Sequence, residues 1–466
     1  MKTWIKDIVN KVDETVPLSG WVSNRRDHGK LIFIDLRDRS GVCQVVFGPW
    51  SGEDIYAQAQ KLRSEWVIQI QGFIKKRPEN MINPELSTGT VEVDVKELII
   101  INESQTPPFP LEGDGYEIDE EVRMKYKYLD LRRPRLQKNL GIRHRVIKFI
   151  RDYLDTEGFY EVETPILTKS TPEGARDYVV PSRLYTGSFY ALPQSPQQYK
   201  QLLMASGVEK YFQIARCFRD EDTRGDRQPE FTQMDLEMSF VEREDVMQLN
   251  EKLLITLVQT VFPEKKIQQV PFPRITYKEA MEKYGTDRPD LRENQEDKNL
   301  LAFCWVVDFP FFEKTEEGGW TFTHNPFSQP KPEHLELLMQ KERIGDILTT
   351  QYDIALNGFE IGGGSIRAHN PQVLSRVFEI MGYGSETIQK NFGHMLEAFS
   401  YGTPSHGGIA WGLDRLLAIL QNEPNIREVI PFPKTGDARD LMMSAPSELD
   451  PKQLQELHID IRTKKV

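Results

Sequence analysis

The sequence of 466 residues has few cysteines and no long apolar segment. Its three cysteines, Cys43, Cys217 and Cys304, are widely spaced and form no C-x-x-C pair, which argues against a disulfide framework and a cysteine-based zinc site. The longest unbroken apolar run, residues 300–307, has 8 residues. A membrane-spanning helix needs ~18 or more. The first ten residues also lack the apolar stretch of a signal peptide. We therefore expect a cytoplasmic protein with no membrane role.

Several motifs of nucleotide and hydrolytic chemistry are also missing. No G-x-x-x-x-G-K-[ST] phosphate loop occurs, and the glycines at 362–364 do not extend to G-x-G-x-x-G. H-E-x-x-H and G-x-S-x-G motifs are absent, and the eight histidines do not cluster. If the chain binds a nucleotide, it must use arginines and a sheet surface rather than a glycine-rich loop.

Positive charge is in the minority, with 59 Lys and Arg against 71 Asp and Glu and a net charge of −12. Fields are screened beyond ~8–10 Å at physiological salt, so an acidic chain can still carry a local basic surface. Residues 1–104 contain 14 basic and 15 acidic side chains, and residues 25–39 contain five basic and three acidic ones. The net charge therefore does not exclude a nucleic-acid partner.

The N-terminal part of the chain predicts a small β-barrel. Short runs rich in β-branched and aromatic residues, separated by turn signals, predict strands at 19–22, 31–36, 42–47, 66–73 and 90–101, with a helix near 53–63. Five strands in about 100 residues fit a barrel of the OB type. The proline-rich residues 106–110 predict a stiff linker. We expect a barrel domain at 1–104, a linker at 105–135 and a second domain at 136–466.

The second domain alternates helices and strands. Its pattern predicts helices at 143–158, 245–261, 371–381 and from about 412, and strands at 160–165, 211–219, 230–240 and 351–356. This mixture predicts an α+β domain around a largely antiparallel sheet.

A charged hairpin between the strands at 211–219 and 230–240 is the first candidate for chemistry. Arg219 stands near the end of an apolar strand, where its guanidinium group could bind a phosphate bidentately. Glu221 could accept a hydrogen bond from an adenine amino group, and Phe231 offers a ring face for stacking. The alternative is a solvated hairpin rich in ion pairs.

A second segment, residues 405–415, places small residues before a helix that begins with Asp414 and Arg415. Taken alone, it could be an ordinary glycine-rich turn into a core helix. Together, the hairpin and this segment resemble motifs 2 and 3 of the class II aminoacyl-tRNA synthetases. The helix at 143–158 and the strand ending at Pro165 look like motif 1, the dimer element of that family.

Within class II, the chain resembles the bacterial aspartyl-tRNA synthetases over nearly its whole length. The matching segments are 20–22, 33–38, 171–178, 192–197, 357–367 and 431–434. The resemblance implies an α+β chain with an N-terminal OB-fold β-barrel that binds the anticodon. A class II synthetase catalytic domain, built on an antiparallel sheet flanked by helices, would follow. ATP, L-aspartate and tRNA-Asp would be substrates, Mg²⁺ a cofactor, and the chain a homodimer. The usual insertion after residues 284–292 is missing, because only residues 293–299 precede the next apolar strand.

The resemblance implies an ATP site. Arg219 would bind the α-phosphate and stabilise charge while the α-carboxylate of aspartate attacks it. Phe231 and Arg415 would sandwich the adenine, and Glu360 with Asp353 would coordinate Mg²⁺. Arg219, Glu360 and Arg415 are the expected catalytic residues. The expected ATP-binding residues are Arg219, Glu221, Gln228, Phe231, Glu360, Gly412, Leu413, Asp414 and Arg415.

The resemblance also implies an aspartate pocket. Glu173, Ser195 and Gln197 would contact the ammonium group, with Glu173 on a loop that closes over the substrate. The expected aspartate-binding residues are Glu173, Ser195, Gln197, Lys200, Arg219, Asp235, His324 and Arg367.

Selection against asparagine is expected to depend on charge. Lys200 and Arg367 would bind the side-chain carboxylate, with Asp235 orienting them. Asparagine is isosteric but neutral, so it would leave both cations buried without a counter-charge, at a cost of at least ~1–3 kcal/mol. Alternatively, Lys200 could be a surface lysine on its helix, and Arg367 a strand arginine paired with a neighbour.

In the barrel, the resemblance implies an anticodon surface. Phe33 could stack on a base, Gln44 could bond a base edge, and Arg26 could meet a phosphate. Phe33 could equally belong to the core, and Arg26 to a solvated turn. His28 is similar to the form in bacterial enzymes that charge both tRNA-Asp and tRNA-Asn, whereas Asn80 departs from the Gly often found in them. The sequence thus leaves open whether tRNA-Asn is also a substrate.

Two other functions stay open at this point. An asparaginyl-tRNA synthetase has a comparable length, although Lys200, Asp235 and Arg367 argue against it. A non-catalytic tRNA-binding paralogue would need only the barrel, and the joint presence of Arg219 and Glu360 argues against it.

Overall fold

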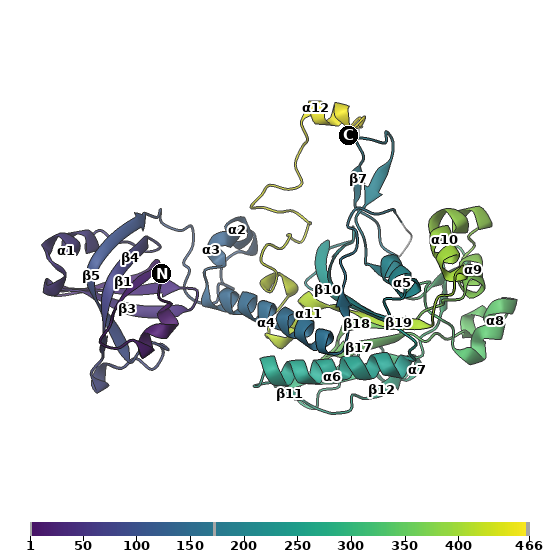
Figure 1. Ribbon diagram of the computed structural model, residues 1–466, viewed down its shortest axis with the longest axis horizontal. Coiled ribbons are helices and arrows are strands. Elements are labelled where there is room, and N and C mark those ends of the chain that lie inside the picture. Colours follow the sequence, from purple (N-terminus) through teal and green to yellow (C-terminus); the bar gives the residue numbers. More distant parts are fainter. Residues whose placement is uncertain (1, 171–173, 463–466) are drawn as a thin grey trace. The chain divides into compact units, whose positions relative to one another are not determined.

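The computed structural model describes residues 2–170 and 174–462 and divides into two compact units, Met1–Gln137 and Lys138–Val466 (Figure 1). Each unit has its own hydrophobic core. The division falls close to position 136, where the sequence places the start of the second domain. Residues 105–137 belong to the first unit rather than standing apart as a linker.

Five strands close into the barrel of the first unit, as the sequence predicts. They are β1 (Thr15–His28), β2 (Leu31–Asp38), β3 (Gly41–Phe47), β4 (Val67–Lys76) and β5 (Val91–Asn102), in the order β1-β2-β3-β5-β4. Alternate residues such as Ile32, Ile34 and Leu36 fill the barrel, because successive side chains of a strand point to opposite faces. Helix α1 (Glu53–Ala59) follows β3 in the chain.

The residues after the barrel fold around one buried carboxylate. They form the short helices α2 (Glu120–Lys125) and α3 (Lys127–Asp130), which the sequence analysis did not predict. Asp130 is fully buried and accepts from Arg123 at 3.1 Å, Lys127 at 2.9 Å and Arg133 at 2.8 Å. Burial alone would raise the pKa of Asp130, but these three cations outweigh burial and lower it. The cluster therefore holds this segment in a defined shape.

A second ion pair attaches the segment to the barrel. Arg132 donates to Glu65 at 2.7 Å, and Arg37 of β2 donates to the same buried carboxylate at 2.8 Å. The Arg132 guanidinium also lies 5.4 Å from the centre of the Trp21 ring. Residues 105–137 are thus held against the barrel by the Arg132–Glu65 ion pair and the Arg132–Trp21 contact, in addition to the covalent connection.

The second unit is built on one sheet of eight strands. These are β6 (Tyr160–Glu161), β9 (Lys210–Phe218), β10 (Glu230–Ser239), β12 (Arg274–Thr276), β14 (Phe303–Val307), β17 (Tyr352–Leu356), β18 (Phe359–Ile366) and β19 (His406–Gly412). Their order is β12-β14-β17-β18-β19-β10-β9-β6, and only the outermost pairs at each edge are parallel. The expected antiparallel α+β architecture is confirmed. The strand expected at 160–165 is shorter and ends at Glu161.

Three helices cover one face of this sheet: α4 (Pro134–Thr156), α6 (Arg243–Val261) and α11 (Leu413–Leu420) (Figure 1). Met234, Leu236 and Met238 of β10 point into the core beneath them. The alternate residues of β10 therefore point to the opposite face. That opposite face carries the polar side chains of the candidate site.

The remaining elements lie around this frame. The helices are α5 (Gln197–Ala205), α7 (Tyr277–Tyr284), α8 (Leu335–Gln340), α9 (Pro371–Ile380), α10 (Ser385–Ser400) and α12 (Pro451–Glu456). The small sheets pair β7 (Val179–Pro181) with β8 (Phe189–Ala191), β11 (Lys266–Ile267) with β13 (Leu300–Leu301), and β15 (Phe312–Lys314) with β16 (Trp320–Phe322).

The connection from α7 to β13, residues 285–299, is short and well bonded. Asp290 pairs with Arg292 at 2.7 Å. The Gln268 side chain donates to the Leu291 carbonyl at 2.9 Å and accepts from the Glu293 amide at 2.9 Å. The sequence predicts a missing insertion at this position, and a compact loop occupies it.

The three cysteines are buried and free of disulfides, Cys43 in the barrel and Cys217 and Cys304 in the large sheet. Burial raises the pKa of the Cys43 thiol and raises that of Cys304 to about 12. Across the described residues, no helix is both long and apolar enough to cross a membrane.

Candidate active site

The floor of the site is a row of register partners across four strands. Asp235 of β10 lies opposite Ala410 of β19, which lies opposite Gly363 of β18, which lies opposite Asp353 of β17. Small residues in the middle of the row leave space above the sheet, and a Cβ on Gly363 would come within 2.5 Å of the Asp353 carboxylate. A cavity of about 280 Å³ lies here, with a carboxylate on each side.

Lys200, Asp235 and Arg367 line this cavity, and the buried carboxylate of Glu237 lies behind them. Lys200 of α5 is 1% exposed, and its Nζ lies 2.8 Å from Asp235 and 3.3 Å from Glu237. Arg367, which follows β18, donates to both oxygens of Glu237, at 2.9 and 3.1 Å. Glu237 fits because its neighbour in the sheet is Gly408, where a Cβ would lie 2.3 Å from the carboxylate.

The burial and the ion pairs of Lys200 and Arg367 decide between the alternative interpretations of these two residues. They also correct the expected basis of selection against asparagine. Lys200 is buried, so it is not a surface lysine, whereas Arg367 does pair with a neighbour, Glu237. Both cations already have counter-charges within the protein. The expectation that asparagine would leave them without a counter-charge is therefore wrong, because Asp235 and Glu237 supply it.

The two carboxylates differ in their electrostatics. Burial raises the pKa of Asp235, although Lys200 opposes this shift. Burial would also raise the pKa of Glu237, but Arg367 and Lys200 outweigh burial and lower it. Glu237 is thus the more firmly ionised partner.

The other residues expected to bind aspartate lie around the same cavity. Ser195, Gln197 and His324 line it together with Arg219. Burial lowers the pKa of His324, whose ring meets that of Phe309 edge-on at 4.5 Å. Glu173 lies outside the described residues, so its predicted contact stays a prediction.

A larger cavity of about 660 Å³ adjoins the small one. Its lining includes these residues of the expected ATP site: Arg219, Glu221, Gln228, Phe231, Glu360, Gly412, Asp414 and Arg415. The two cavities share Arg219, His324 and Glu360 in their walls. The structure thus brings most residues of the two predicted sets together around two adjoining cavities, Leu413 excepted and Glu173 lying outside the described residues.

The arginines of the larger cavity are held by the sheet and the hairpin. The Arg219 guanidinium lies 5.1 Å from the centre of the Phe231 ring, and its buried Nε has no partner among the described residues. Arg415 donates to the Glu360 carbonyl and, at 3.2 Å, to the Asp226 carboxylate. Both cations thus line the space expected to hold the ATP phosphates.

Three residues of the expected ATP site have structural partners. Asp414 accepts from Arg143 and, at 2.9 Å, from the Thr232 amide. The Gln228 side chain donates to the Lys434 carbonyl at 3.1 Å and accepts from its amide at 2.7 Å. The Leu413 side chain lies in the hydrophobic core and does not line the cavity. A contact of Leu413 with ATP could come only from its backbone and stays a prediction.

Asp353 and Glu360 are the predicted metal ligands. Asp353 is buried and accepts from Gln351 at 2.7 Å. Burial and the charge of Glu360 raise the pKa of Asp353 well above its ordinary value. Residues 2–170 and 174–462 contain no group of three or more His, Cys, Asp or Glu arranged to hold a metal. A pair of carboxylates beside a phosphate site nevertheless suits Mg²⁺, which is commonly bound by one or two carboxylates plus substrate phosphates.

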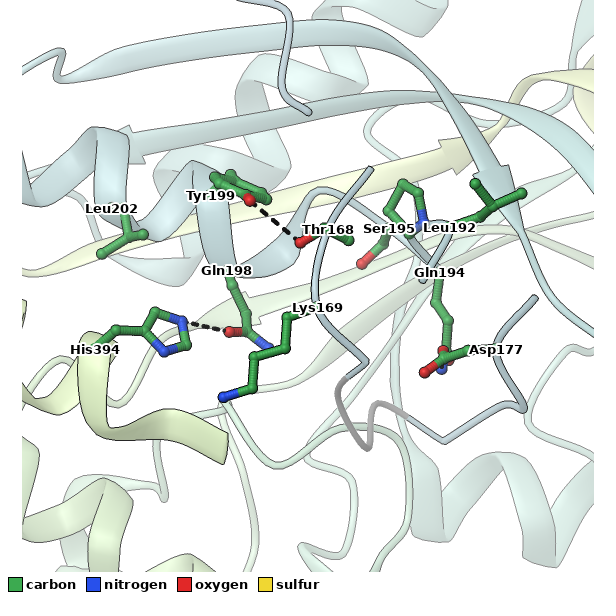
Figure 2. Close-up of a pocket in the computed structure, with 11 residues that line it drawn as sticks. Thr168, Lys169, Asp177, Leu192, Gln194, Ser195, Gln198, Tyr199, Leu202 and His394 are labelled. Carbon is green, nitrogen blue, oxygen red and sulfur yellow. Dashed lines mark hydrogen bonds between the residues drawn. The ribbon is translucent and has the colours of Figure 1, made fainter. Parts of the chain in front are cut away.

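A third cavity, of about 220 Å³, is lined by residues of α5 and α10 (Figure 2). Gln198, Tyr199 and Leu202 of this helix line it, and His394 of α10 bonds Gln198 at 2.8 Å. Gln197 and Lys200 of the same helix line the small cavity instead. Different residues of α5 therefore line the two cavities, which share Gln194 and Ser195 just before the helix.

The barrel residues predicted to meet the anticodon share its outer surface. Arg26 of β1 lies opposite Phe33 of β2, and Asp35, two residues along β2, lies opposite Gln44 of β3. Arg26 donates to Asp35 at 2.9 Å. Phe33 is half-buried and lies outside the barrel core, so the alternative of a core residue is wrong. His28 is exposed at the end of β1.

Glu237, the carboxylate that pairs with both cations, was not predicted from the sequence. The signal was present in the alternation of strand β10, where Gln233, Asp235 and Glu237 interleave with Met234 and Leu236. Alternation places these three polar residues on one face. Their partners on α5 and β18 are distant in sequence, so the pairing itself could not be predicted.

Two family models match the chain. The family "tRNA synthetases class II (D, K and N)" matches residues 119–436, and "OB-fold nucleic acid binding domain" matches residues 16–101. A crystal structure of asparaginyl-tRNA synthetase from Pyrococcus horikoshii, complexed with asparaginyl-adenylate, superposes with a TM-score of 0.76. It covers 97% of this chain and all of that one, at 23% identity, which shows a shared fold.

Curated relatives are closer in sequence. The chain is 41% identical to an aspartate–tRNA ligase of Staphylococcus saprophyticus and 42% identical to an aspartate–tRNA(Asp/Asn) ligase of Thermoanaerobacter, over 97% of each chain in both cases. The first alignment spans 576 positions, 110 more than the 466 residues of this chain, so the relative carries residues that are absent here. The chain belongs to the class II tRNA synthetase family (D, K and N), and within it to the aspartate–tRNA ligases.

Proposed function

We propose that the chain activates L-aspartate with ATP and transfers it to tRNA-Asp. In the first step an α-carboxylate oxygen attacks the α-phosphorus, and pyrophosphate leaves as aspartyl-adenylate forms. In the second step a hydroxyl at the 3′ end of the tRNA attacks the acyl carbon and AMP leaves. The observation that carries this proposal is the small cavity with buried Lys200 and Arg367, which adjoins a larger cavity lined by Arg219 and Arg415.

Selection of aspartate can be argued from hydrogen-bond donors. Lys200 and Arg367 carry donors only, and two donors of the lysine are used by Asp235 and Glu237. The third donor suits a substrate carboxylate, whereas the NH₂ of asparagine in the same place would face another donor. An unsatisfied buried group costs ~1–3 kcal/mol. A site built on polar pairing can reject an analogue ~10⁴–10⁵-fold. The donors of Lys200 and Arg367 therefore favour aspartate over asparagine as the substrate.

The reaction itself depends on positioned charge. Arg219, shared by both cavities, stands where it can bind the α-phosphate and the attacking carboxylate together. Arg415 would neutralise charge on the departing pyrophosphate side. Asp353 and Glu360 would hold Mg²⁺, which when bound supplies positive charge to the phosphate oxygens. The presence of this whole set argues against a non-catalytic paralogue.

The barrel supplies a surface for the anticodon. Phe33 offers a half-buried ring for stacking, and Arg26 and Gln44 stand beside it on neighbouring strands. His28 and the Asp/Asn-type name of one relative favour tRNA-Asn as a second substrate. We further propose a homodimer formed through the motif 1 elements α4 and β6, and a cytoplasmic location.

Pyrophosphate exchange into ATP tests the amino-acid assignment. We expect exchange with L-aspartate, and background exchange with L-asparagine at the same concentration. Exchange with asparagine alone would instead identify an asparaginyl enzyme, and tight tRNA binding without any exchange would identify a non-catalytic paralogue.

Charging of purified tRNA-Asp and tRNA-Asn tests the tRNA assignment. We expect aspartate on both tRNAs, and no charging of tRNA-Asn above background would limit the enzyme to tRNA-Asp. Sedimentation at micromolar concentration tests the dimer, and a monomer would contradict it.

A further inference from the structure

Behind the small cavity, three side chains form a chain of hydrogen bonds that begins at a backbone carbonyl. His406 Nδ1 lies 2.8 Å from the Pro404 oxygen, and His406 Nε2 lies 3.2 Å from Gln201 Nε2. The oxygen of Gln201 then accepts from the side-chain NH₂ of Gln197 at 2.9 Å. His406 and Gln201 are fully buried, and Gln197 lines the cavity. This series of hydrogen bonds thus runs from the protein core to the wall of the small cavity.

The donor and acceptor of each hydrogen bond in this series follow from the bond between His406 and the Pro404 carbonyl. A carbonyl oxygen can only accept, so Nδ1 of His406 carries the hydrogen. Burial lowers the pKa of His406 to about 4, so near neutral pH the ring has one hydrogen and Nε2 must accept. Gln201 must then turn its NH₂ toward the histidine and its oxygen toward Gln197. The NH₂ of Gln197 donates to the Gln201 oxygen, so the side-chain oxygen of Gln197 remains available to accept a hydrogen bond from a ligand.

The surroundings of His406 keep the ring in this state. The negative charge of Glu237 favours a second proton on the ring, but Arg367 binds both oxygens of this carboxylate. Arg367 and His369 disfavour a second proton on the ring. The rings of Phe399 and His369 lie 6.0 and 6.2 Å away, which leaves the imidazole packed on two sides.

We propose that Gln201 and His406 are positioning residues that turn the oxygen of Gln197 toward the amino group of the substrate. Among the described residues, none donates a hydrogen bond to this oxygen. An acceptor at this position favours an ammonium group, whereas a reversed amide would present N–H donors to it and repel it. The inference rests on the proposed function, since it takes aspartate as the ligand, and it adds two residues that do not touch the substrate.

The test compares two ligands that differ only in the amino group. L-aspartate affinity is followed through the KM in pyrophosphate exchange, and succinate affinity through competitive inhibition of that exchange. In Gln201→Met, which is similar in size but neither donates nor accepts as an amide does, Gln197 loses its partner. We expect aspartate to bind about tenfold more weakly, the size of one lost hydrogen bond to a charged group, while succinate affinity changes less than about twofold. KM for ATP should stay unchanged.

Matched variants separate orientation from packing. Asn250→Leu replaces another fully buried amide, on α6 away from the site, and should leave the ratio of the two affinities unchanged. His406→Gln keeps an acceptor near the position of Nε2 and should bind aspartate more tightly than His406→Leu. This pair tests the same chain of bonds if Gln201→Met fails to fold.

The outcomes are distinct. Equal weakening of aspartate and succinate in Gln201→Met, or no weakening of either, would overturn the inference and leave Gln201 with a structural role. Equal affinities in the two His406 variants would also overturn it. If the wild-type protein shows no exchange with aspartate, the proposed function has failed, independently of any variant.

Discussion

At the scale of single residues, the site is organised around a neutral set of four buried charges. Lys200 and Arg367 are balanced by Asp235 and Glu237 before any substrate binds. Buried ion pairs add little net stability over apolar residues, but removing one partner is costly, because the other charge stays buried and unpaired. Each of the four residues is therefore expected to matter for folding as well as for activity.

Lys200→Met tests this coupling. We expect pyrophosphate exchange with aspartate to fall at least ~100-fold, because a charged hydrogen bond to the substrate is lost in a buried site. The free energy of unfolding should fall by ~3–5 kcal/mol, because two carboxylates lose a buried partner. Lys148→Met is the control, since the Lys148–Asp152 pair is exposed and should contribute less than ~0.5 kcal/mol. Urea unfolding and exchange rates measure both effects, and equal losses in the two variants would contradict the expectation.

His406 should make stability depend on pH. In the unfolded chain a histidine has a pKa of ~6.5, and burial lowers that of His406 to about 4. Between these values the unfolded state binds the extra proton, so the free energy of unfolding falls as the pH falls. From pH 7 to pH 5 this group should remove ~2 kcal/mol from the wild type. Urea unfolding at several pH values should show that loss to be absent in His406→Gln, and parallel pH curves for the two proteins would refute it.

At the scale of elements, strand β18 fits beside the Asp353 carboxylate because Gly363 has no side chain. Gly363→Ala would bring a methyl group against the Asp353 carboxylate, which lies 2.5 Å from the position of a Cβ. We expect the protein to fold with exchange activity reduced by at least ~10-fold, because displacing a positioned group by about 1 Å can cost ~100-fold. KM for ATP should rise with added Mg²⁺ held constant. Activity equal to the wild type would show that the strand shifts freely.

Gly141 in helix α4 is the opposite case. It is exposed, its backbone is helical, and a Cβ would meet no atom within 4 Å. Alanine restricts the unfolded chain and favours helix, so Gly141→Ala should stabilise the protein by ~0.5–1 kcal/mol without changing exchange. A rise in the thermal midpoint measures this gain. A fall in the thermal midpoint would contradict this expectation.

The sequence predicted elements well where alternation or helical spacing was strong. The hairpin of β9 and β10 and the barrel strands appear where expected, because each has one apolar face that must be buried. Helices α2 and α3 were missed because they are short and are held by the charges around Asp130 rather than by an apolar stripe. Ion pairs such as that of Glu237 with Arg367 join segments far apart in the sequence, so no local sequence pattern predicts them.

At the scale of the whole molecule, the first unit extends beyond its barrel. Fragment 1–137 keeps Arg132, whereas fragment 1–104 leaves the buried Glu65 with Arg37 as its remaining cation. We expect the longer fragment to be more stable by ~1–3 kcal/mol, the range for hydrogen bonds to charged groups. Thermal unfolding of both fragments measures the difference. Arg132→Met in the longer fragment is the control and should remove much of the gain, and equal midpoints in all three would contradict it.

The buried cysteines have a practical consequence for spectroscopy. Because all three native thiols are enclosed, and burial raises the pKa of Cys43 and Cys304, they should resist alkylating reagents while the protein stays folded. A thiol introduced at the exposed position of His28 would then be the main site of labelling. A fluorophore attached there would report the arrival of RNA at the barrel without any need to remove native cysteines first.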